Sequence, residues 1–364
     1  MRAKVLILTN HSYMFWRFRR ELVQTLLDSC GCEVVLSTPF VGHEKDLAAM
    51  GIRCIQTDVD RRGMNPFRDR KLLNTYQRLL QEEQPDLVIA YSIKPNIYGG
   101  MVCKRSGTPY YANVQGMGTA FERPFLAFAV SVLYRNAFRK VRKVFFENAS
   151  DAEEFCRRRI IRKEKEVVLH GAGINLQEYN CTPYPDNKKV HFLYLGRIMR
   201  EKGMDELFMA AERLYRENNG FVLDLVGFYE DDYQKTIQRL EKENIAHFYG
   251  FQENPKPYYQ ACDCVILPSW HEGMSNVLLE AAAIGRPVIT SDIPGCREAV
   301  DAGKTGLLIT PGNADSLYKA MKQFLTFSRE TRKRMGICGR EKMQREFSKE
   351  RVVADTIREL EILQ

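Results

Sequence analysis

Residues 264–292, CVILPSWHEGMSNVLLEAAAIGRPVITSD, constrain the fold more than any other part of the sequence. The apolar residues 265–267 are typical of a buried parallel strand. A polar loop follows, after which Ser275 is a favourable N-cap for a helix of strong helix formers at 276–284. Residues 288–290 predict the next strand, so the stretch predicts a strand–helix–strand unit. Its loop lies at the carboxyl end of a parallel strand, where open α/β sheets bind ligands.

Two carboxylates lie in this unit, Glu272 in the loop and Glu280 on the helix. The first turn of a helix has unpaired backbone N–H groups, which suit a phosphate. The residues that place such groups here are Gly273, Met274, Ser275 and Asn276. Glu280 can accept two hydrogen bonds from a vicinal diol such as ribose, while Glu272 can reach a different part of the same ligand. The alternative interpretation is that both glutamates only favour a helix start.

A second motif follows a predicted strand at 190–195, which continues into LGRIMREKGMDEL. Gly196 lets a ligand approach the backbone closely. Arg197 and Lys202 bring two positive charges to the rim of the sheet, just before a helix predicted to begin near Met204. Fixed cations stabilise the negative charge that forms on a departing diphosphate. The alternative is that these are two exposed basic residues in a turn.

The string EGMSNVLLEAAAIGRPVI resembles the donor-site motif of glycosyltransferase family 4, and GRIMREKG resembles the diphosphate motif of the same family. The resemblance implies an α/β protein of the GT-B fold, with two Rossmann-like domains facing across a cleft. It also implies that Glu272, Arg197 and Lys202 take part in a transfer that retains the configuration at the anomeric carbon. The region around Phe251 matches the family region that meets the nucleobase, and Gly227 either cradles a phosphate or turns the chain.

Apolar strand candidates alternate with helical patterns along both halves of the chain, which predicts parallel sheets covered on both faces. The 364 residues suffice for two domains with cores of their own. The glycine-rich string HGAGIN at 170–175 predicts the crossover between them. We therefore expect an acceptor-binding domain at 1–170 and a donor-binding domain at 171–346. By resemblance to the family, a final helix at about 347–364 returns to the first domain.

Three loops of the amino-terminal half, at 10–22, 91–100 and 113–122, follow predicted strands and share the carboxyl edge of the sheet. With residues 60–69 they resemble a bacterial subgroup of the family, whose members lengthen oligosaccharides attached to undecaprenyl diphosphate. This resemblance implies an acceptor site in this half. Its candidate residues are Lys94, Asn96, Gln115, Gly116, Gly118 and Thr119.

His11, in the first of these loops, is a candidate of a different kind. Many members of the family carry a histidine in an amino-terminal loop, close to the reacting carbon of the donor. The third loop has Gln115 and no histidine, so His11 is the nearest candidate for that place. Capping or loop packing is the alternative, and a role as general base does not follow from the residues.

The net charge of +8 permits an acidic partner: a nucleic acid, an anionic membrane surface or a phosphorylated substrate. Arg135, Arg139 and Arg142 have the spacing of one helix face, and further arginines, among them Arg19, lie in the first loop. Together they predict a basic patch that faces an anionic membrane. The sequence has neither a signal-peptide pattern nor a run long enough to span a membrane. We therefore expect a peripheral protein on the cytoplasmic face of the inner membrane.

We expect neither a metal nor a cofactor. The donor half has no DxD-type pair between a strand and a loop, and Asp231 and Asp232 are adjacent acids at a helix start. Arg197, Lys202 and the helix end supply the positive charge that a metal would otherwise provide. Ten cysteines without a secretory pattern suggest reduced thiols in a cytosolic protein.

The sequence as a whole predicts an enzyme that moves a hexose or N-acetylhexosamine from a nucleotide sugar to a lipid-diphosphate-linked saccharide in surface glycan synthesis. By resemblance the nucleotide is UDP. We favour attack from the same face, with the departing phosphate accepting the acceptor's proton, because no carboxylate nucleophile is evident in the amino-terminal loops. Two alternatives stay open. A sugar-nucleotide 2-epimerase of the same fold would need no acceptor, and a basic nucleic-acid-binding protein would not be an enzyme.

Overall fold

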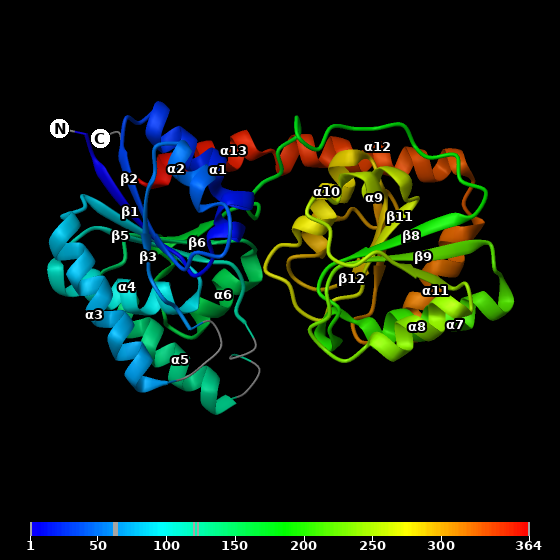
Figure 1. Ribbon diagram of the computed structural model, residues 1–364, viewed down its shortest axis with the longest axis horizontal. Helices are drawn as coiled ribbons and strands as arrows, with labels where there is room; N and C mark the ends of the chain where they lie inside the picture. The colour runs from blue at the N-terminus through cyan, green and yellow to red at the C-terminus, as the bar shows by residue number, and fades with distance from the viewer. Residues whose placement is uncertain (1, 61–64, 119–120, 122–123, 363–364) are drawn as a thin grey trace. The chain divides into compact units, whose positions relative to one another are not determined.

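The computed structural model describes the chain apart from residues 1, 61–64, 119–120, 122–123 and 363–364 (Figure 1). The chain forms two compact units. Unit 1 contains Met1–Ala172 and Glu350–Gln364, and unit 2 contains Gly173–Lys349. From the sequence, we expected the chain to pass from the first domain to the second at 170–171 and to return at 346–347.

Unit 1 is built on a seven-stranded parallel sheet in the order β3-β2-β1-β4-β5-β6-β7. Its strands are β1 (Lys4–Leu8), β2 (Glu33–Thr38), β3 (Arg53–Gln56), β4 (Leu87–Tyr91), β5 (Tyr110–Val114), β6 (Lys143–Phe146) and β7 (Glu166–Val168). Its helices are α1 (Ser12–Asp28), α2 (Glu44–Ala49), α3 (Pro66–Glu83), α4 (Ile93–Ser106), α5 (Pro124–Ala137), α6 (Ala149–Arg157) and α13 (Lys349–Glu359). Figure 1 shows α1, α2 and α13 on one face of this sheet and α3, α4 and α5 on the other.

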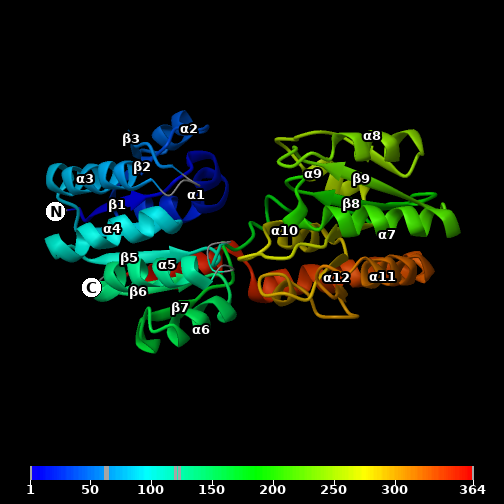
Figure 2. The same ribbon diagram turned by 90° about the horizontal axis from the view of Figure 1, so that it is seen from below.

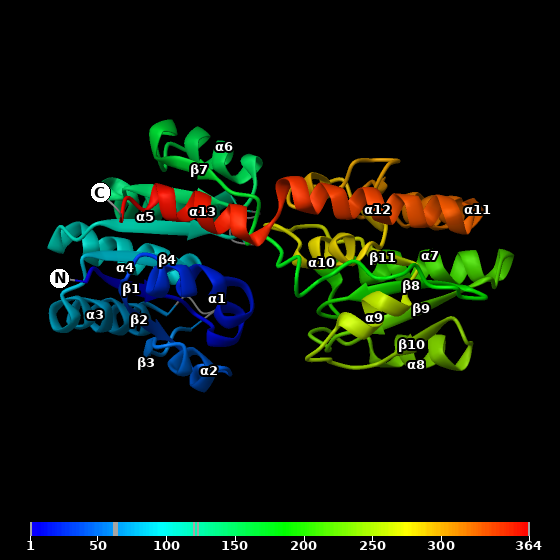
Figure 3. The same ribbon diagram turned by 90° about the horizontal axis from the view of Figure 1, so that it is seen from above.

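The last helix of the chain completes unit 1. Val352, Val353 and Ile357 of α13 are buried in the same cluster as Phe15 of α1 and residues of the central strands. The hydroxyl of Tyr111 in β5 donates a hydrogen bond to the carbonyl of Leu360, at 2.9 Å. Figure 3 shows α13 lying along the sheet beside α1. One face of the sheet is therefore covered in part by the final residues of the chain.

Two of the three predicted loops of unit 1 are largely helical, so that part of the sequence interpretation was wrong. Helix α1 begins at Ser12 and α4 at Ile93. Gly99 and Gly100, which we read as loop residues, lie inside α4. A Cβ atom on Gly99 would lie 2.7 Å from a methyl of Leu8, and one on Gly100 would lie 3.0 Å from the carbonyl of Ala137. These glycines therefore serve close packing of α4 against β1 and α5.

The predicted basic patch also differs from the structure. Helix α5 ends at Ala137 and β6 begins at Lys143, so Arg135, Arg139 and Arg142 do not share one helix face. Arg19 is buried in α1 and forms an ion pair with Glu147 at 2.8 Å. Its guanidinium also lies over the ring of Tyr91. A partner 128 residues away along the chain explains why an arginine is buried here.

Unit 2 is built on a six-stranded parallel sheet in the order β10-β9-β8-β11-β12-β13. Its strands are β8 (Val190–Leu195), β9 (Phe221–Val226), β10 (Ala246–Phe248), β11 (Cys264–Leu267), β12 (Val288–Ser291) and β13 (Gly306–Ile309). Its helices are α7 (Met204–Glu217), α8 (Gln234–Lys242), α9 (Lys256–Ala261), α10 (Asn276–Ile284), α11 (Ala314–Thr326) and α12 (Arg329–Glu346). Figure 1 shows α9, α10 and α12 on one face of this sheet and α7, α8 and α11 on the other.

The strand–helix–strand unit predicted from residues 264–292 is confirmed. It consists of β11, α10 and β12, and β11 pairs with β12 in parallel. Ser275 takes an extended N-cap conformation, and Gly285 ends the helix with φ of 89°. The residues of α10 from Leu278 to Ile284 are all buried, because the helix packs between the sheet and α12.

Two arginines donate hydrogen bonds to backbone carbonyls of residues 176–183, the segment by which the chain enters unit 2. Arg286 is fully buried, and burial lowers the pKa of its guanidinium because removal from water disfavours the charged form. At 2.8–3.3 Å it donates to the backbone carbonyls of Thr182, Pro183, Tyr259 and Gln260. At 2.6–3.0 Å, Arg340 donates to the carbonyls of Leu176, Tyr179 and Ala283. The sequence interpretation did not identify either residue.

Candidate active site

Three glycines, Gly196, Gly227 and Gly250, form backbone hydrogen bonds at the carboxyl edge of the sheet in unit 2. The N–H of Gly196, after β8, donates to the carbonyl of Val226, and the N–H of Gly227, after β9, donates to that of Gly250. A Cβ atom on Gly227 would lie 1.7 Å from the carbonyl oxygen of Gly196. This close approach is sufficient reason for a glycine at 227, and a contact with phosphate stays a prediction.

The two predicted donor motifs meet at an ion pair. Lys202 lies in the short 3₁₀ turn Arg200–Lys202 before α7, and its Nζ is 2.5 Å from Oε1 of Glu272. The hydroxyl of Ser269 donates to the same oxygen at 2.8 Å. The turn packs directly against the end of β11. A Cβ atom on Gly203, which follows the turn, would lie only 2.2 Å from the carbonyl oxygen of Pro268. Both charged side chains are largely buried, so the pair is held in place by the fold.

Arg197 follows β8, the strand that pairs with β11. Its guanidinium forms an ion pair with Glu230 at 2.7 Å, and its carbonyl accepts a hydrogen bond from the hydroxyl of Tyr194. Burial raises the pKa of Tyr194, the charge of Glu272 raises it further, and Arg197 acts in the opposite direction. Arg197 and Glu272 thus follow neighbouring strands at the carboxyl edge of the sheet.

Cys296, in the loop after β12, is fully buried. Burial raises the pKa of its thiol first, and the charges of Glu272 and Glu298 raise it while Lys202 opposes them. The structure brings Lys202 and Glu272 together at the carboxyl edge, whereas Arg197 is ion-paired with Glu230, and its place beside a diphosphate stays a prediction.

The amides predicted to bind phosphate are only partly accessible. The N–H of Ser275 donates to the carbonyl of Gly295 at 3.0 Å, so it is not directed at a ligand, and this part of the prediction was wrong. Met274 is buried in the core of unit 2. The loop after β12 lies directly on this segment, since a Cβ atom on Gly295 would lie 2.3 Å from the carbonyl oxygen of Gly273. Gly273 and Asn276 are half-buried, and their contact with phosphate stays a prediction.

Glu280 is more enclosed than the sequence suggested. It is 3% exposed, and its carboxylate accepts a hydrogen bond from the hydroxyl of Tyr259 at 2.8 Å. Tyr259 belongs to α9, so this bond ties α9 to α10. The structure therefore gives Glu280 a packing role, and its contact with ribose stays a prediction.

Phe251, the predicted neighbour of the nucleobase, is exposed after β10. The ring of Phe228, which is also exposed, lies edge to face with it at 6.1 Å between centroids. Sequence reasoning missed Phe228, although its position directly after Gly227 at a strand end was a usable signal. Together the two rings form an exposed aromatic surface on which a base could stack.

A polar cluster occupies the carboxyl edge of unit 1. The hydroxyl of Ser92, after β4, donates to Oδ1 of Asn10, after β1, at 2.9 Å, and lies 3.5 Å from Oε1 of Gln115, after β5. Ser92 has φ of 76° and ψ of 160°, a costly conformation for a residue with a Cβ atom. Backbone strain of this kind occurs preferentially at functional sites. Sequence reasoning found Gln115 but missed Asn10 and Ser92.

Of the other predicted acceptor residues, Gly116, Gly118 and Lys94 are at least partly exposed, whereas Asn96 is buried. Gly116 and Gly118 lie on the loop after β5, with φ of 137° and 71°, and Lys94 is ion-paired with Asp69 at 2.7 Å. Asn96 is 1% exposed, and its amide donates to the carbonyl of Asn113. Asn96 therefore joins α4 to β5 inside the unit, and its assignment to the acceptor surface was wrong. The predicted acceptor residue Thr119 lies outside the described residues.

His11 is the N-cap residue of α1, directly after β1. It is half-buried, and its ring lies 6.3 Å from that of Tyr13. This position at the carboxyl edge is the one expected from the sequence. A part in the chemistry stays a prediction.

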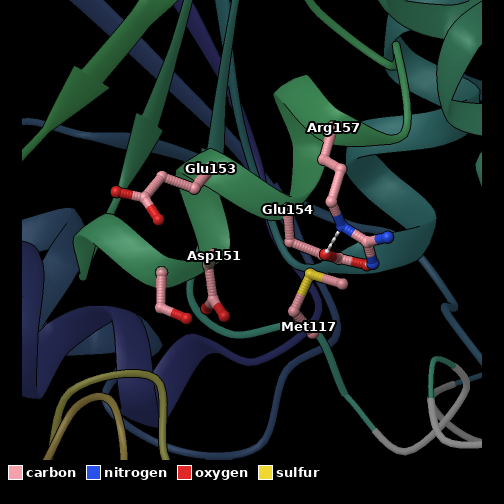
Figure 4. Close-up of a pocket in the computed structure, with 6 residues that line it drawn as sticks. Met117, Asp151, Glu153, Glu154 and Arg157 are labelled. Atoms are coloured by element: carbon pink, nitrogen blue, oxygen red, sulfur yellow. Dashed lines mark hydrogen bonds and ion pairs between the residues drawn. The ribbon is translucent and has the colours of Figure 1, made fainter.

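A pocket of about 450 Å³ lies beside the loop after β5 (Figure 4). It is lined by Met117 and by residues of α6, namely Ser150, Asp151, Glu153, Glu154 and Arg157. Figure 4 shows the Glu154–Arg157 ion pair on one side of it and the carboxylate of Asp151 beneath. The sequence gave no signal for this pocket, because its lining comes from a helix that we did not assign to the site.

Two further features are absent from the described part of the chain. There, no group of three or more histidine, cysteine, aspartate or glutamate residues is placed to hold a metal ion. The described helices also include none with the length and apolar character needed to cross a bilayer.

Comparison with known proteins identifies the class. Residues 183–342 match the family model described as glycosyl transferases group 1, and residues 4–148 match the one described as glycosyl transferase 4-like. Both domains of the chain thus belong to glycosyltransferase families, which confirms the family predicted from the sequence.

The relatives include enzymes of bacterial glycan synthesis. The chain is 26% identical over 328 residues to the N,N'-diacetylbacillosaminyl-diphospho-undecaprenol alpha-1,3-N-acetylgalactosaminyltransferase of Campylobacter jejuni, covering 85% of this chain and 86% of that protein. It is 22% identical over 301 residues to the capsular polysaccharide biosynthesis glycosyltransferase CapM of Staphylococcus aureus, covering 78% of each. Among solved structures, Anabaena HepE in complex with UDP and glucose aligns over 100% of both chains, with a TM-score of 0.82 and 18% identity. This likeness confirms the predicted α/β fold.

Proposed function

We propose that the protein transfers a hexose or N-acetylhexosamine from a UDP-sugar to a polyprenyl-diphosphate-linked saccharide, with retention at the anomeric carbon. The observation that carries the proposal is the ion pair of Lys202 with Glu272, which joins the two donor motifs. The name of the Campylobacter relative supports a lipid-diphosphate acceptor, and the UDP bound to HepE supports the nucleotide.

The arrangement suits departure of a diphosphate. As the bond between the anomeric carbon and the phosphate oxygen breaks, negative charge collects on that phosphate. Lys202 and Arg197 stabilise this charge, and Glu272 keeps the ammonium group in position before the charge develops. The acceptor hydroxyl attacks from the face that the phosphate leaves, and its proton passes to the phosphate oxygen. No protein nucleophile is needed in this sequence of events.

The acceptor belongs to unit 1 in this proposal. Gln115, Ser92 and Asn10 offer amide and hydroxyl groups at one edge of the sheet, and Lys94 adds a positive charge to the first turn of α4. Such groups recognise sugar hydroxyls and phosphates. A lipid-linked acceptor places the protein at the cytoplasmic face of the inner membrane as a peripheral protein.

The main test is a screen of UDP-sugars against undecaprenyl-diphosphate saccharides in detergent, with product mass as the readout. A mass increase of one sugar, dependent on both substrates, is the expected result. Formation of an isomerised sugar from the donor alone would instead support the 2-epimerase. If no substrate is turned over and the protein binds RNA or DNA, a nucleic-acid-binding protein would be supported.

The two glutamates are expected to differ in their effects. Glu280→Ala should weaken binding of UDP roughly tenfold to a hundredfold, as expected when a hydrogen bond to a charged group is lost. Glu272→Ala should mainly lower turnover, because it releases Lys202. Calorimetric titration with UDP and steady-state kinetics separate the two effects. Thermal unfolding serves as the control, because loss of the Tyr259 contact also affects stability in the Glu280 variant.

Activity is expected to be independent of divalent metal. In this proposal Arg197 and Lys202, each ion-paired with a glutamate in the structure, supply the positive charge at the leaving group. Turnover in excess EDTA should therefore equal that in Mg²⁺ or Mn²⁺ within experimental error. A large loss in EDTA that Mg²⁺ restores would contradict this expectation.

A further inference from the structure

Helix α5 (Pro124–Ala137) buries one face and exposes an apolar one. Its buried residues are Ala127, Val130, Ser131, Tyr134 and Ala137. Its exposed apolar residues are Phe125, Phe128, Ala129, Val132 and Leu133. These five recur at i, i+3, i+4, i+7 and i+8, which places them along one stripe of the helix. Phe125 is 93% exposed and Phe128 is 66% exposed, so the described residues of unit 1 leave the stripe uncovered.

A third exposed aromatic residue lies on the same side of unit 1. Phe67, in the first turn of α3, is 87% exposed. Helices α3, α4 and α5 pack side by side on one face of the sheet, as Figure 2 shows. Each helix runs back against the direction of the strands, so the amino ends of α3 and α5 lie towards the carboxyl edge of the sheet. Phe67 and Phe125 therefore lie towards the edge that carries Gln115 and Gly118.

Exposed cations outnumber exposed acids on these helices. In the described residues of α3, α4, α5 and the turns that follow them, the exposed acids are Glu82 and Asp86, and the exposed cations are Arg68, Arg70, Lys71, Arg78, Arg105, Arg135, Arg139, Lys140 and Arg142. Asp69, the acidic residue in the first turn of α3, is ion-paired with Lys94. An apolar stripe flanked by arginine and lysine matches the chemistry of helices that lie in the surface of an anionic bilayer. The same cations would repel one another across a symmetric contact between two copies of the chain.

We propose that the exposed stripe of α5, together with Phe67, inserts into the surface of an anionic bilayer and holds the carboxyl edge of unit 1 at the lipid. This surface differs from the arginine patch expected from the sequence, because its binding energy comes from aromatic side chains as well as from charge. The inference rests on the proposed function, in which the acceptor is linked to a lipid. The lipid contact itself requires no catalysis.

Co-sedimentation of the full chain with vesicles tests the proposal. The chain should bind vesicles of phosphatidylcholine with phosphatidylglycerol, and bind weakly to phosphatidylcholine alone. The double variant Phe125→Ser, Phe128→Ser should lose at least tenfold in partition coefficient. Met209→Ser is the matched control, because Met209 is 64% exposed on α7 of unit 2. A second variant, Arg139→Gln with Lys140→Gln, should weaken binding to the anionic vesicles while both phenylalanines remain.

Two results would overturn the inference. One is equal vesicle binding by the wild type, the phenylalanine variant and the Met209 control. The other is a wild-type dimer in size-exclusion chromatography that the phenylalanine substitutions convert to a monomer without changing vesicle binding, which would assign the stripe to a second copy of the chain.

Transfer to a short-chain, water-soluble acceptor diphosphate separates this inference from the proposed function. Without membranes, the wild type and the phenylalanine variant should turn over at the same rate. Absence of transfer by both proteins would count against the proposed function, while the vesicle experiment would still decide on the lipid contact.

Discussion

Replacing Lys202 by methionine is expected to lower kcat/KM about 10²- to 10³-fold, equivalent to about 2.7–4 kcal/mol of lost transition-state stabilisation. The ammonium group is held by Glu272 at the point where the fold brings both donor motifs together. Its charge acts most strongly when the leaving phosphate becomes more negative. Methionine retains most of the apolar stem but supplies no charge. Initial-rate kinetics with the donor and acceptor identified in the screen provide the measurement.

Two further variants sharpen the Lys202 experiment. Lys235→Met removes an exposed lysine from α8 and should leave the rate unchanged. Lys202→Arg keeps the charge and should recover part of the lost activity. If Lys202→Met raised only the KM for the donor and left kcat intact, Lys202 would bind the ground state and the transition state equally. The proposed part of Lys202 in the chemical step would then be wrong.

Replacing Arg286 by methionine is expected to lower the free energy of unfolding of unit 2 by about 3 kcal/mol or more. Each buried carbonyl that loses its donor costs about 1–3 kcal/mol, and Arg286 serves several of them. The chain has two tryptophans, Trp16 in unit 1 and Trp270 in unit 2. In a Trp16→Phe background, urea unfolding followed by tryptophan fluorescence therefore reports unit 2 alone.

Arg213→Met is the matched control for the Arg286 experiment. Arg213 is an exposed arginine of α7, ion-paired with Asp315 at the surface. Surface pairs of this kind contribute little to stability, so the unfolding midpoint should change little. Equal midpoints for the Arg286 and Arg213 variants would mean that water replaces the guanidinium at the carbonyls.

The sequence was most informative where a local pattern and a chemical requirement coincide. The strand, the N-cap at Ser275 and the glycine at 285 are local signals, and they predicted the arrangement of β11, α10 and β12. The meeting of Lys202 with Glu272 could also be predicted, because the ends of neighbouring parallel strands share one edge of a sheet. The hydrogen bond from Ser275 to Gly295 could not, since it depends on how the loop after β12 folds over the helix start.

Unit 1 was predicted less well, because its polar residues have distant partners. From the sequence alone, Arg19 resembles a surface cation, but in the structure it is ion-paired with Glu147. Asn96 resembles a loop amide, but its side chain donates a hydrogen bond to β5. No local pattern reveals such partners. Ser92 is a different case, since its positive φ arises from the turn between β4 and α4 and a serine does not signal that conformation.

The position of α13 has a consequence for synthesis of the chain on the ribosome. Unit 2 is continuous in sequence, whereas unit 1 needs its last segment, Glu350–Gln364, to cover one face of the sheet. Domains generally fold in the order in which they emerge. Here the first domain to emerge is the last to be completed. Its apolar face around Tyr111 stays without the side chains of Val352 and Ile357 until residues 350–364 have been synthesised, so the nascent amino-terminal half exposes apolar surface while unit 2 is being made.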